Sequence, residues 1–441
     1  MRMPLLGTLA LGILAGGMAM TAPGLTPEQH AGEIQRTKPD LIVYRPKGEF
    51  IQGENQHFLV TPLPSGRLLA VWTQSTRENA DDQSIVNATS DDGGKTWTAP
   101  RKLDGAGPDD PPRTGLASWG FPILAPKLGR VYVFYNKNVG IQDTREDTTG
   151  VMRGRYSEDA GRTWSETFDL PIAPGALSHP DPKVPQSWIV YQRPILAADG
   201  VPIAGFTHWG SAGRFGKIGL FEMDSEIRFL RFENLLTEKD PKRLRVTTWP
   251  KSDHGLRVPR EDKPQVSVVQ EPSLVVLPDE RLFCVMRTLN GYVAWAQSRD
   301  HGRTWSKAEP LRYRDGGDLV LQPISPCPLY PLRDGRFLLL FHNNDGTAHG
   351  GKGPGDYKKN RYPAYLAVGH YRPEARQPVW FEQPKELMSS DGVVLGPSRR
   401  TEVATYTSFT DYRGRYILWY PDRKHFLLGK YIEPDRYAGG F

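Results

Sequence analysis

The sequence predicts an all-β fold, a six-bladed β-propeller, and three observations support this prediction. The chain of 441 residues contains 45 glycines, 39 prolines, 11 tryptophans and 18 tyrosines. This composition suits short antiparallel strands joined by tight turns better than it suits helices. One eight-residue motif occurs three times, and six segments follow a strand–turn–strand pattern. Repeats of this kind are typical of blades arranged around an axis.

The eight-residue motif has the pattern S-x-D-x-G-x-T-W and occurs at Ser90–Trp97, Ser157–Trp164 and Ser298–Trp305. Its aspartate can accept hydrogen bonds from backbone N–H groups of a turn, its glycine allows a positive φ, and its tryptophan can cover the gap between sheets. The first two copies are 67 residues apart and the last two 141, about twice as far. A degenerate copy is therefore expected near Phe229–Phe232, and Val379–Phe381 resembles a further remnant.

The six strand–turn–strand segments predict the two inner strands of six blades, with the repeated motif joining the outer two. These segments are His57–Trp72, Phe121–Tyr135, Tyr191–Phe206, Glu271–Met286, Ser325–Phe341 and Tyr406–Tyr420. No linker divides the chain, so residues 23–441 are predicted to form one domain. Residues 211–265 and 345–363 lack strong periodicity and are interpreted as loops or insertions. A small extra blade within 211–265 stays open as an alternative.

Residues 1–22 are predicted to be a secretory signal. Arg2 precedes an apolar run from Leu5 to Met20, and small residues follow up to Ala22, where we expect cleavage. The alternative, an uncleaved membrane anchor, is disfavoured because the run is shorter than the ~20 apolar residues of a span. The predicted location is therefore secreted or periplasmic, with no attachment to a membrane after cleavage.

Charge and cysteine content narrow the classes of partner. The net charge of +6 is mild, and no basic stripe interleaved with aromatic residues predicts binding to nucleic acid. Cys284 and Cys327 lie in predicted core strands, which favours buried thiols, with a single disulfide as the alternative. The sequence indicates no cofactor. An acidic carbohydrate is the predicted partner.

Chemically active residues open several of the predicted innermost strands. Because these strands begin near one mouth of the propeller axis, we expect His57, Trp119, Arg193, Glu271 and Tyr406 to converge there. A histidine, an arginine, a glutamate and a tyrosine at one axial space do not resemble an ordinary core. Further candidates for the same mouth are His208, Arg361 and the pair His342 and Asn343. For His342 and the residues after it, a turn is favoured over a cation site.

The repeated motif resembles the Asp box of the sialidase (neuraminidase) superfamily over roughly residues 40–435. This resemblance implies a propeller of the sialidase type. The segment from Glu271 to Arg287 is similar to the superfamily's Glu-to-Arg segment, and Tyr406 begins a segment similar to the one that carries the nucleophilic tyrosine. Asp82 lies in the loop where the resemblance implies the acid/base aspartate. In such a site a carboxylate activates the tyrosine and arginine holds an anionic substrate.

The sequence also departs from the sialidase pattern. Sialidases clamp a carboxylate with three arginines, but only Arg287 matches here, since the first and fifth blades open with Asn55–Phe58 and Ser325–Pro328. Arg193 or Arg361 are the candidate replacements. We therefore expect weak or no cleavage of a standard sialoside.

Three functions follow as alternatives. The first is an exo-acting glycosidase on an acidic glycan, with Tyr406 as nucleophile, Glu271 as its base and Asp82 as acid. The second is a polysaccharide lyase on uronate-containing glycans, of the ulvan-lyase or rhamnosyl-glucuronate type. There an arginine would neutralise the uronate, and Tyr406 or a histidine such as His57 would take the proton. The third is a non-catalytic glycan-binding propeller, in which Glu271, Arg287 and Tyr406 only close the axis.

Overall fold

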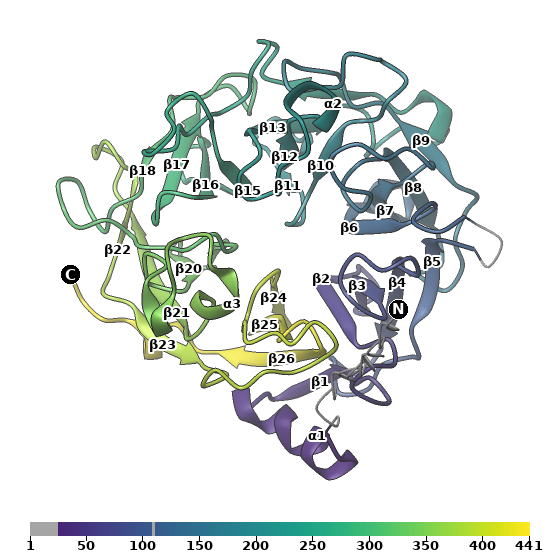
Figure 1. Cartoon of the computed structure of the whole chain (residues 1–441), viewed down its shortest axis with the longest axis horizontal. Helices are drawn as coiled ribbons and strands as arrows, with labels where there is room; N and C mark the ends of the chain where they lie inside the picture. Colours follow the sequence, from purple (N-terminus) through teal and green to yellow (C-terminus); the bar gives the residue numbers. More distant parts are fainter. Residues whose placement is uncertain (1–24, 108–110) are drawn as a thin grey trace, which may run out of the picture.

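The computed structural model describes residues 25–107 and 111–441, so the predicted signal at 1–22 lies outside the described residues. Six antiparallel sheets of four or five strands form a ring around one central axis (Figure 1). Each of the six predicted strand–turn–strand segments supplies inner strands of a different sheet. The prediction of a six-bladed all-β propeller is confirmed.

The first three blades run in chain order from the axis outward. Blade one consists of β2 (Glu54–Pro62), β3 (Leu68–Ser75), β4 (Ser84–Ser90) and β5 (Arg101–Gly105). Blade two consists of β6 (Ala117–Ala125), β7 (Arg130–Lys137), β8 (Val151–Ser157) and β9 (Phe168–Leu170). Blade three consists of β10 (Ser187–Ile189), β11 (Ile195–Leu196), β12 (Pro202–Trp209), β13 (Ser225–Phe232) and β14 (Val246–Trp249).

The other three blades complete the ring. Blade four consists of β15 (Val269–Val276), β16 (Leu282–Thr288), β17 (Val293–Ser298) and β18 (Glu309–Pro310). Blade five consists of β19 (Leu329–Pro331), β20 (Phe337–Phe341), β21 (Ala364–Tyr371), β22 (Val379–Phe381) and β23 (Lys385–Met388). Blade six consists of β24 (Ser408–Tyr412), β25 (Arg415–Asp422), β26 (Phe426–Ile432) and β1 (Leu41–Tyr44).

The ring is closed by pairing between the two ends of the propeller. β1, from the N-terminal part, pairs with β26 from the C-terminal part, with Leu41 opposite Gly429. This pairing removes the free edges that an open ring would leave. The sequence analysis did not predict β1, because a four-residue strand between polar segments gives little periodic signal.

Helices are few and short, and they lie between strands or at the chain ends. They are α1 (Pro27–Glu33), α2 (Ala212–Phe215) and α3 (Tyr357–Asn360), with 3₁₀ turns η1 (Ile34–Thr37), η2 (Pro126–Leu128), η3 (Pro241–Arg243), η4 (Ala348–Gly350) and η5 (Pro434–Tyr437). α1 packs outside blade six next to β1 (Figure 1). Within 25–107 and 111–441, no helix has the length and apolar character needed to cross a membrane.

The three repeated motifs are turns between the third and fourth strands of blades one, two and four. In the first copy, Asp92 accepts hydrogen bonds from the backbone N–H groups of Lys95 (3.0 Å) and Thr96 (2.9 Å). The motif tryptophans pack on the preceding blade: the Trp97 ring is 5.8 Å from Trp419, and the Trp305 ring is 4.0 Å from Phe229. The structural role predicted for this motif is confirmed.

The segment 211–265 was interpreted as loop or extra blade, and this interpretation was wrong. It contains β13 and β14, the third and fourth strands of blade three, and the described residues contain no seventh sheet. Phe229–Phe232 belongs to β13, and the turn that follows, 233–245, lacks the motif. Aromatic residues recur there because they pack between blades, not because the turn repeats.

Cys284 and Cys327 are free thiols with no exposed surface. Burial raises the pKa of both thiols above the ordinary value, so both stay protonated and unreactive at neutral pH. The prediction of buried thiols is confirmed.

Candidate active site at the axial mouth

A shared backbone feature turns side chains toward the axis. His57, Trp119, Glu271 and Tyr406 have φ between 54° and 59°, the left-handed region that such residues seldom adopt. The first three sit at register shifts in β2, β6 and β15, which marks them as β-bulges in three innermost strands. Such a residue costs about 1–3 kcal/mol and is retained where the surrounding structure imposes it, often at functional sites.

A cavity of about 110 Å³ lies at this end of the axis. Five cationic side chains line it, Arg145, Arg287, Arg361, Arg400 and Lys424, whereas Glu78 and Glu271 are its lining carboxylates. The remaining lining residues are Trp119, Ile189, Trp209, Leu220, Phe221, Tyr357 and Tyr406. The excess of cations favours an anionic ligand.

Tyr406 and Glu271 form the centre of this pocket. The Tyr406 hydroxyl donates a hydrogen bond of 3.0 Å to Oε1 of Glu271, while Oε2 lies 2.7 Å from Nη1 of Arg287. The backbone N–H of Glu271 donates to Oγ1 of Thr207 in blade three (2.7 Å), which fixes the bulge. Burial raises the pKa of Glu271, although Arg287 and Arg361 act in the opposite direction. A carboxylate with a raised pKa accepts a proton more readily, as a base for Tyr406 must.

Three arginines of the pocket each have an internal carboxylate partner. Arg287 pairs with Glu271, Arg361 with Glu402 (2.7 Å) and Arg400 with Glu78. The Nε–H groups of all three arginines are buried and have no hydrogen-bond partner among the residues that the structure describes. Such orphaned donors are costly, so a ligand or water with acceptor oxygens would be stabilised beside them.

Lys424 links the carboxylates of this charge network. Its Nζ is 3.0 Å from Glu78 and 3.4 Å from Glu402, and it lies 5.3 Å from the centre of the Tyr406 ring. Burial would raise the pKa of Glu402, but Lys424, Arg361 and Arg400 together bring that pKa well below its ordinary value. Glu402 is therefore an ion that balances the cations behind the pocket.

Two aromatic side chains narrow the mouth. Phe221 comes from the loop between β12 and β13, and Tyr357 begins α3; their ring centres are 5.1 Å apart. The guanidinium carbon of Arg361 is 5.2 Å from the Tyr357 ring, and that of Arg287 is 5.6 Å from the Phe221 ring. Loops of blades three and five thus meet over the arginines and leave a small opening.

The structure brings five of the predicted site residues into this pocket: Tyr406, Glu271, Arg287, Arg361 and Trp119. It places Asp82 elsewhere. Asp82 is exposed, and its carboxylate accepts hydrogen bonds from the backbone N–H of Thr76 at 3.0 and 3.1 Å. The carboxylate that the same loop directs into the pocket is Glu78, three residues after the end of β3.

His57, His342 and Asn343 do not line the pocket. The His57 ring lies 5.2 Å from Trp119, and burial lowers the pKa of His57 to about 3. His342 has Nε2 3.2 Å from the carbonyl of Val403, and burial lowers its pKa to about 4. Both imidazoles are therefore neutral at physiological pH. Asn343 accepts a hydrogen bond from the Tyr313 hydroxyl at 3.3 Å.

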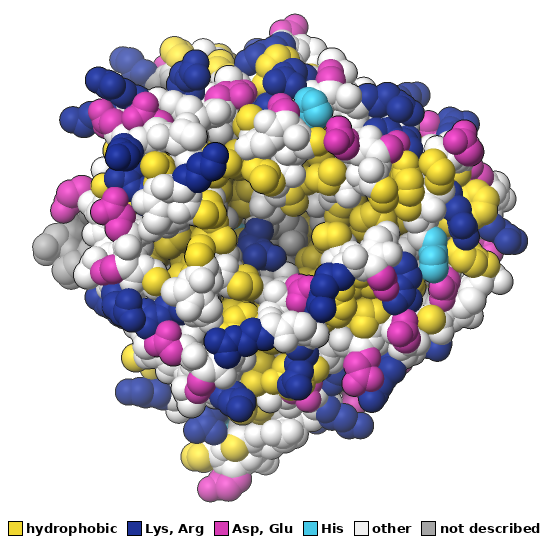
Figure 2. Space-filling model, turned by 180° about the vertical axis from the view of Figure 1, so that it is seen from behind, with side chains coloured by type: hydrophobic (Ala, Val, Ile, Leu, Met, Phe, Trp, Pro, Cys, Tyr) yellow, Lys and Arg dark blue, Asp and Glu magenta, His cyan; other side chains and the backbone are white. Residues whose placement is uncertain are grey.

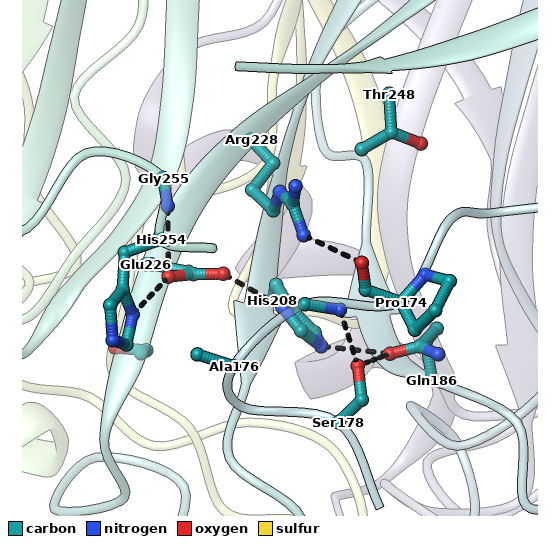
Figure 3. Close-up of polar contacts among 12 residues, drawn as sticks. Pro174, Ala176, Ser178, Gln186, His208, Glu226, Arg228, Thr248, His254 and Gly255 are labelled. Carbon is teal, nitrogen blue, oxygen red and sulfur yellow. Dashed lines mark hydrogen bonds and ion pairs between the residues drawn. The ribbon is translucent and has the colours of Figure 1, made fainter. Parts of the chain in front are cut away.

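His208 belongs to a separate polar cluster on blade three (Figure 3). Its Nδ1 is 3.1 Å from Glu226, and its Nε2 is 2.9 Å from Oε1 of Gln186. The second oxygen of Glu226 is 3.0 Å from Nδ1 of His254. This cluster joins the ends of β12 and β13 to two loops beside Trp209, a residue of the pocket wall. His208 therefore contacts Glu226 and Gln186 next to the pocket wall and does not line the pocket itself.

Arg193 lies between β10 and β11 and does not line the pocket either. The sequence analysis also missed Glu78, Arg145, Arg400, Lys424, Phe221 and Tyr357. Five of these residues come from loops and Tyr357 comes from the short helix α3, so their positions carry no periodic signal of direction. Arg423 and Lys424 have positive φ in the tight turn between β25 and β26, but neither is a residue type that signals such a turn in a sequence.

Comparisons with known proteins place the chain in a family. The BNR repeat-like domain family matches residues 66–392, about three quarters of the chain. A comparison with curated protein sequences finds no significant match.

Solved structures with a similar fold include three sialidase-type proteins. The Hadza microbial sialidase Hz136 shares 17% identity at a TM-score of 0.56, covering 87% of this chain and 66%, just under two thirds, of that one. The NanB sialidase from Streptococcus pneumoniae shares 13% sequence identity at a TM-score of 0.59, covering 91% of this chain and 71% of that one. The intramolecular trans-sialidase from Ruminococcus gnavus shares 14% sequence identity at a TM-score of 0.57, covering 90% of this chain and 98% of that one. The chain therefore belongs to the BNR repeat-like domain family, and its six-bladed propeller has the fold of these solved sialidase structures.

Proposed function

We propose that this chain is an exo-acting glycosidase that removes a terminal, carboxylate-bearing sugar from an acidic glycan other than a standard sialoside. One observation carries the proposal: the Tyr406 hydroxyl donates to the buried Glu271 at 3.0 Å, inside a pocket whose charged lining is five cations and two carboxylates. An ordinary core offers no reason to bury this combination.

The proposed chemistry begins at Tyr406. A tyrosine has an ordinary pKa near 10, so its hydroxyl needs a base to attack at neutral pH. Glu271 takes the proton as the tyrosine oxygen bonds to the anomeric carbon and the glycosidic bond breaks. Water then attacks the anomeric carbon and gives up a proton to Glu78, which had lost its own proton to the leaving oxygen. The glycosyl–tyrosine bond breaks, and Glu271 returns its proton to Tyr406. The developing charge of the sugar ring is balanced by the surrounding carboxylates.

The leaving oxygen needs a proton, and Glu78 is the carboxyl group in position to give it. We assign Glu78 the role that the sequence analysis gave to Asp82, since Glu78 lines the pocket and Asp82 does not. Glu78 is paired with Arg400 and Lys424. A substrate carboxylate that binds Arg400 would release Glu78 to take up and donate a proton.

The charge arrangement supports an anionic substrate but argues against a standard sialoside. Arg287, Arg361 and Arg400 supply three guanidinium groups, the number that the superfamily resemblance implies. Each is already neutralised by an internal carboxylate, so its attraction for a further carboxylate is reduced. The cavity of about 110 Å³ beneath Phe221 and Tyr357 also leaves little room for a large ring substituent.

The fold neighbours and the N-terminus support this setting. The structure of the R. gnavus trans-sialidase is a complex with oseltamivir carboxylate, a ligand that carries a carboxylate. The signal-like residues 1–22 favour secretion or a periplasmic location, where a glycan substrate is accessible.

Product analysis tests the proposal. Purified protein would be incubated with a panel of acidic polysaccharides and sialosides, and products identified by mass spectrometry and ultraviolet absorbance. Release of a saturated acidic monosaccharide, lost in Tyr406→Phe, supports the proposal. An unsaturated uronate product would instead establish a lyase, and glycan binding without any product would establish a binding propeller. Both outcomes contradict the proposal.

A further inference from the structure

A second concave site lies at the opposite end of the propeller. α3, which carries Tyr357 of the axial pocket, is at the front in Figure 1, and Figure 2 shows the reverse face. The axis is hollowed there, with a Lys or Arg side chain deep in the hollow and hydrophobic side chains around it (Figure 2). A half-open groove of about 280 Å³ at this end is lined by Thr61, Pro122, Ile123, Leu124, Pro126, Arg193, Pro194, Ile195, Leu196, Pro202 and Leu236.

Arg193 is the charged residue of this groove, and it lacks a counterion. No carboxylate of the described residues lies within 4 Å of its guanidinium group, whereas the fully buried Arg231, Arg287, Arg361 and Arg423 all have one. Its Nη2 donates one hydrogen bond, of 2.7 Å, to the carbonyl of Phe409 across the axis. The other two nitrogens have no partner among the described residues and are not enclosed, so a ligand can reach them.

Arg228 shows that the fold can satisfy a buried arginine without a carboxylate. Its guanidinium group donates to three backbone carbonyls, those of Pro174, Pro250 and Ser252. Arg193 is partly exposed and has one such bond, and apart from Thr61 the other residues that line its groove are apolar. The pKa of Arg193 is lowered by burial, with Tyr330 as the one titratable neighbour that opposes this effect. An anion in the groove would relieve this unfavourable burial of charge.

We propose that this groove binds an organic monoanion, with its carboxylate on the Arg193 guanidinium and its apolar chain or ring on the leucine-rich wall. Two parallel N–H···O bonds are the usual way in which a guanidinium holds a carboxylate. Ile123, Leu124 and Leu236 supply the apolar contact, and the Leu196 side chain is 56% exposed at the rim. The volume is close to the lower limit of about 300 Å³ for small-molecule sites. The site is independent of the proposed glycosidase reaction.

Calorimetric titration with octanoate tests this site, with octan-1-ol and octylamine as uncharged and cationic probes of the same chain length. We expect saturable binding of octanoate alone. Arg193→Gln should raise the Kd for octanoate by about tenfold or more, because the charge-assisted bonds are lost. The matched control is Arg333→Gln, an exposed arginine at the same end that pairs with Asp411 and should bind octanoate like the wild type.

Three results would overturn the proposal: no saturable octanoate binding below about 10 mM, equal binding of octan-1-ol, or a Kd for Arg193→Gln within twofold of the wild type. If Arg193→Gln does not fold, Leu196→Asp decides the question. Leu196 is exposed, so this variant should fold, and its carboxylate at the rim should repel octanoate and neutralise Arg193. Unchanged octanoate binding by Leu196→Asp would refute the site.

Discussion

Replacing Tyr406 by phenylalanine separates a chemical role from a packing role. The substitution removes one oxygen and keeps the ring, which lies 5.4 Å from Trp119 and 6.5 Å from Tyr191. The lost contact is the 3.0 Å hydrogen bond to Glu271, which remains paired with Arg287 at 2.7 Å. We therefore expect a loss of about 1 kcal/mol in the free energy of unfolding, the net value of one hydrogen bond.

The effect on turnover should be much larger than the effect on folding. Loss of a nucleophile should lower the rate on the true substrate by about a hundredfold or more, equivalent to about 3 kcal/mol of barrier. Denaturant unfolding measures the stability, and product formation from the acidic glycan identified in the panel measures the rate. The two measurements use the same protein preparation, so misfolding cannot be mistaken for lost chemistry.

Tyr191→Phe is the matched control for this experiment. Tyr191 is fully buried beside Tyr406, and within 25–107 and 111–441 its hydroxyl has no hydrogen-bond partner. Removing that hydroxyl relieves an unsatisfied polar group, so stability should be unchanged or slightly higher and activity should stay intact. Equal activity in Tyr406→Phe and Tyr191→Phe would refute a chemical role for Tyr406, as would collapse of the fold in Tyr406→Phe alone.

Three further predictions use other parts of the molecule. A standard sialoside reporter should be cleaved weakly or not at all, because the pocket arginines are already paired; efficient turnover in a fluorescence assay would contradict this. Gly302→Ala should destabilise the fold by about 1–3 kcal/mol, since φ is +87° and an added Cβ would lie 2.3 Å from Ile203; a wild-type unfolding midpoint in denaturant would contradict it. The docking of α1 should weaken in acid. His30 and His425 have Nε2 atoms 2.7 Å apart, and burial lowers the pKa of both, that of His425 to about 4. Their contribution is therefore full above the unfolded pKa near 6.5 and is lost as pH falls toward 4. Limited proteolysis near residue 25 should accelerate at low pH in the wild type and lose this pH dependence in His425→Gln.

Repetition explains why the fold could be predicted from the sequence. The six hairpins and three turn motifs each encode local structure, and a propeller needs little else than their regular succession. Closure by β1 could not be predicted in the same way, because it joins residues almost 400 positions apart and depends on where the last blade ends. Segment 211–265 was misjudged for a related reason: its strands are separated by loops that hide their alternation.

The site could be predicted where it rests on strands and not where it rests on loops. Glu271, Arg287 and Tyr406 lie at or near the ends of inner strands, so strand direction places them at the axis. Glu78 and Arg400 come from connecting segments, and sequence alone does not show which of several charged neighbours turns inward. Asp82 was chosen over Glu78 for this reason.

Arg193 illustrates a different difficulty, an interrupted inner strand. Tyr191 and Arg193 lie in the irregular segment between β10 and β11, where the strand pattern expected from the sequence is broken. Tyr191 packs against Tyr406, whereas Arg193 lies in the groove at the other end of the axis. A pattern that identifies the correct blade can therefore still assign a residue to the wrong end of the propeller.

The arginines at the two ends of the axis differ in how their charge is balanced, and this difference decides what each end can bind. At the mouth, Arg361 and Arg400 are held by Glu402 and Glu78, so an incoming anion must share or displace an existing partner. Such a site gains selectivity, because only a ligand that matches the rearranged network compensates for the broken pairs. At the other end, Arg193 has no carboxylate partner in the described part of the chain, so under our proposal an anion with an apolar body displaces no existing ion pair. Arginines thus favour selective binding of a matching anion at the mouth, and less selective binding of apolar anions at the other end.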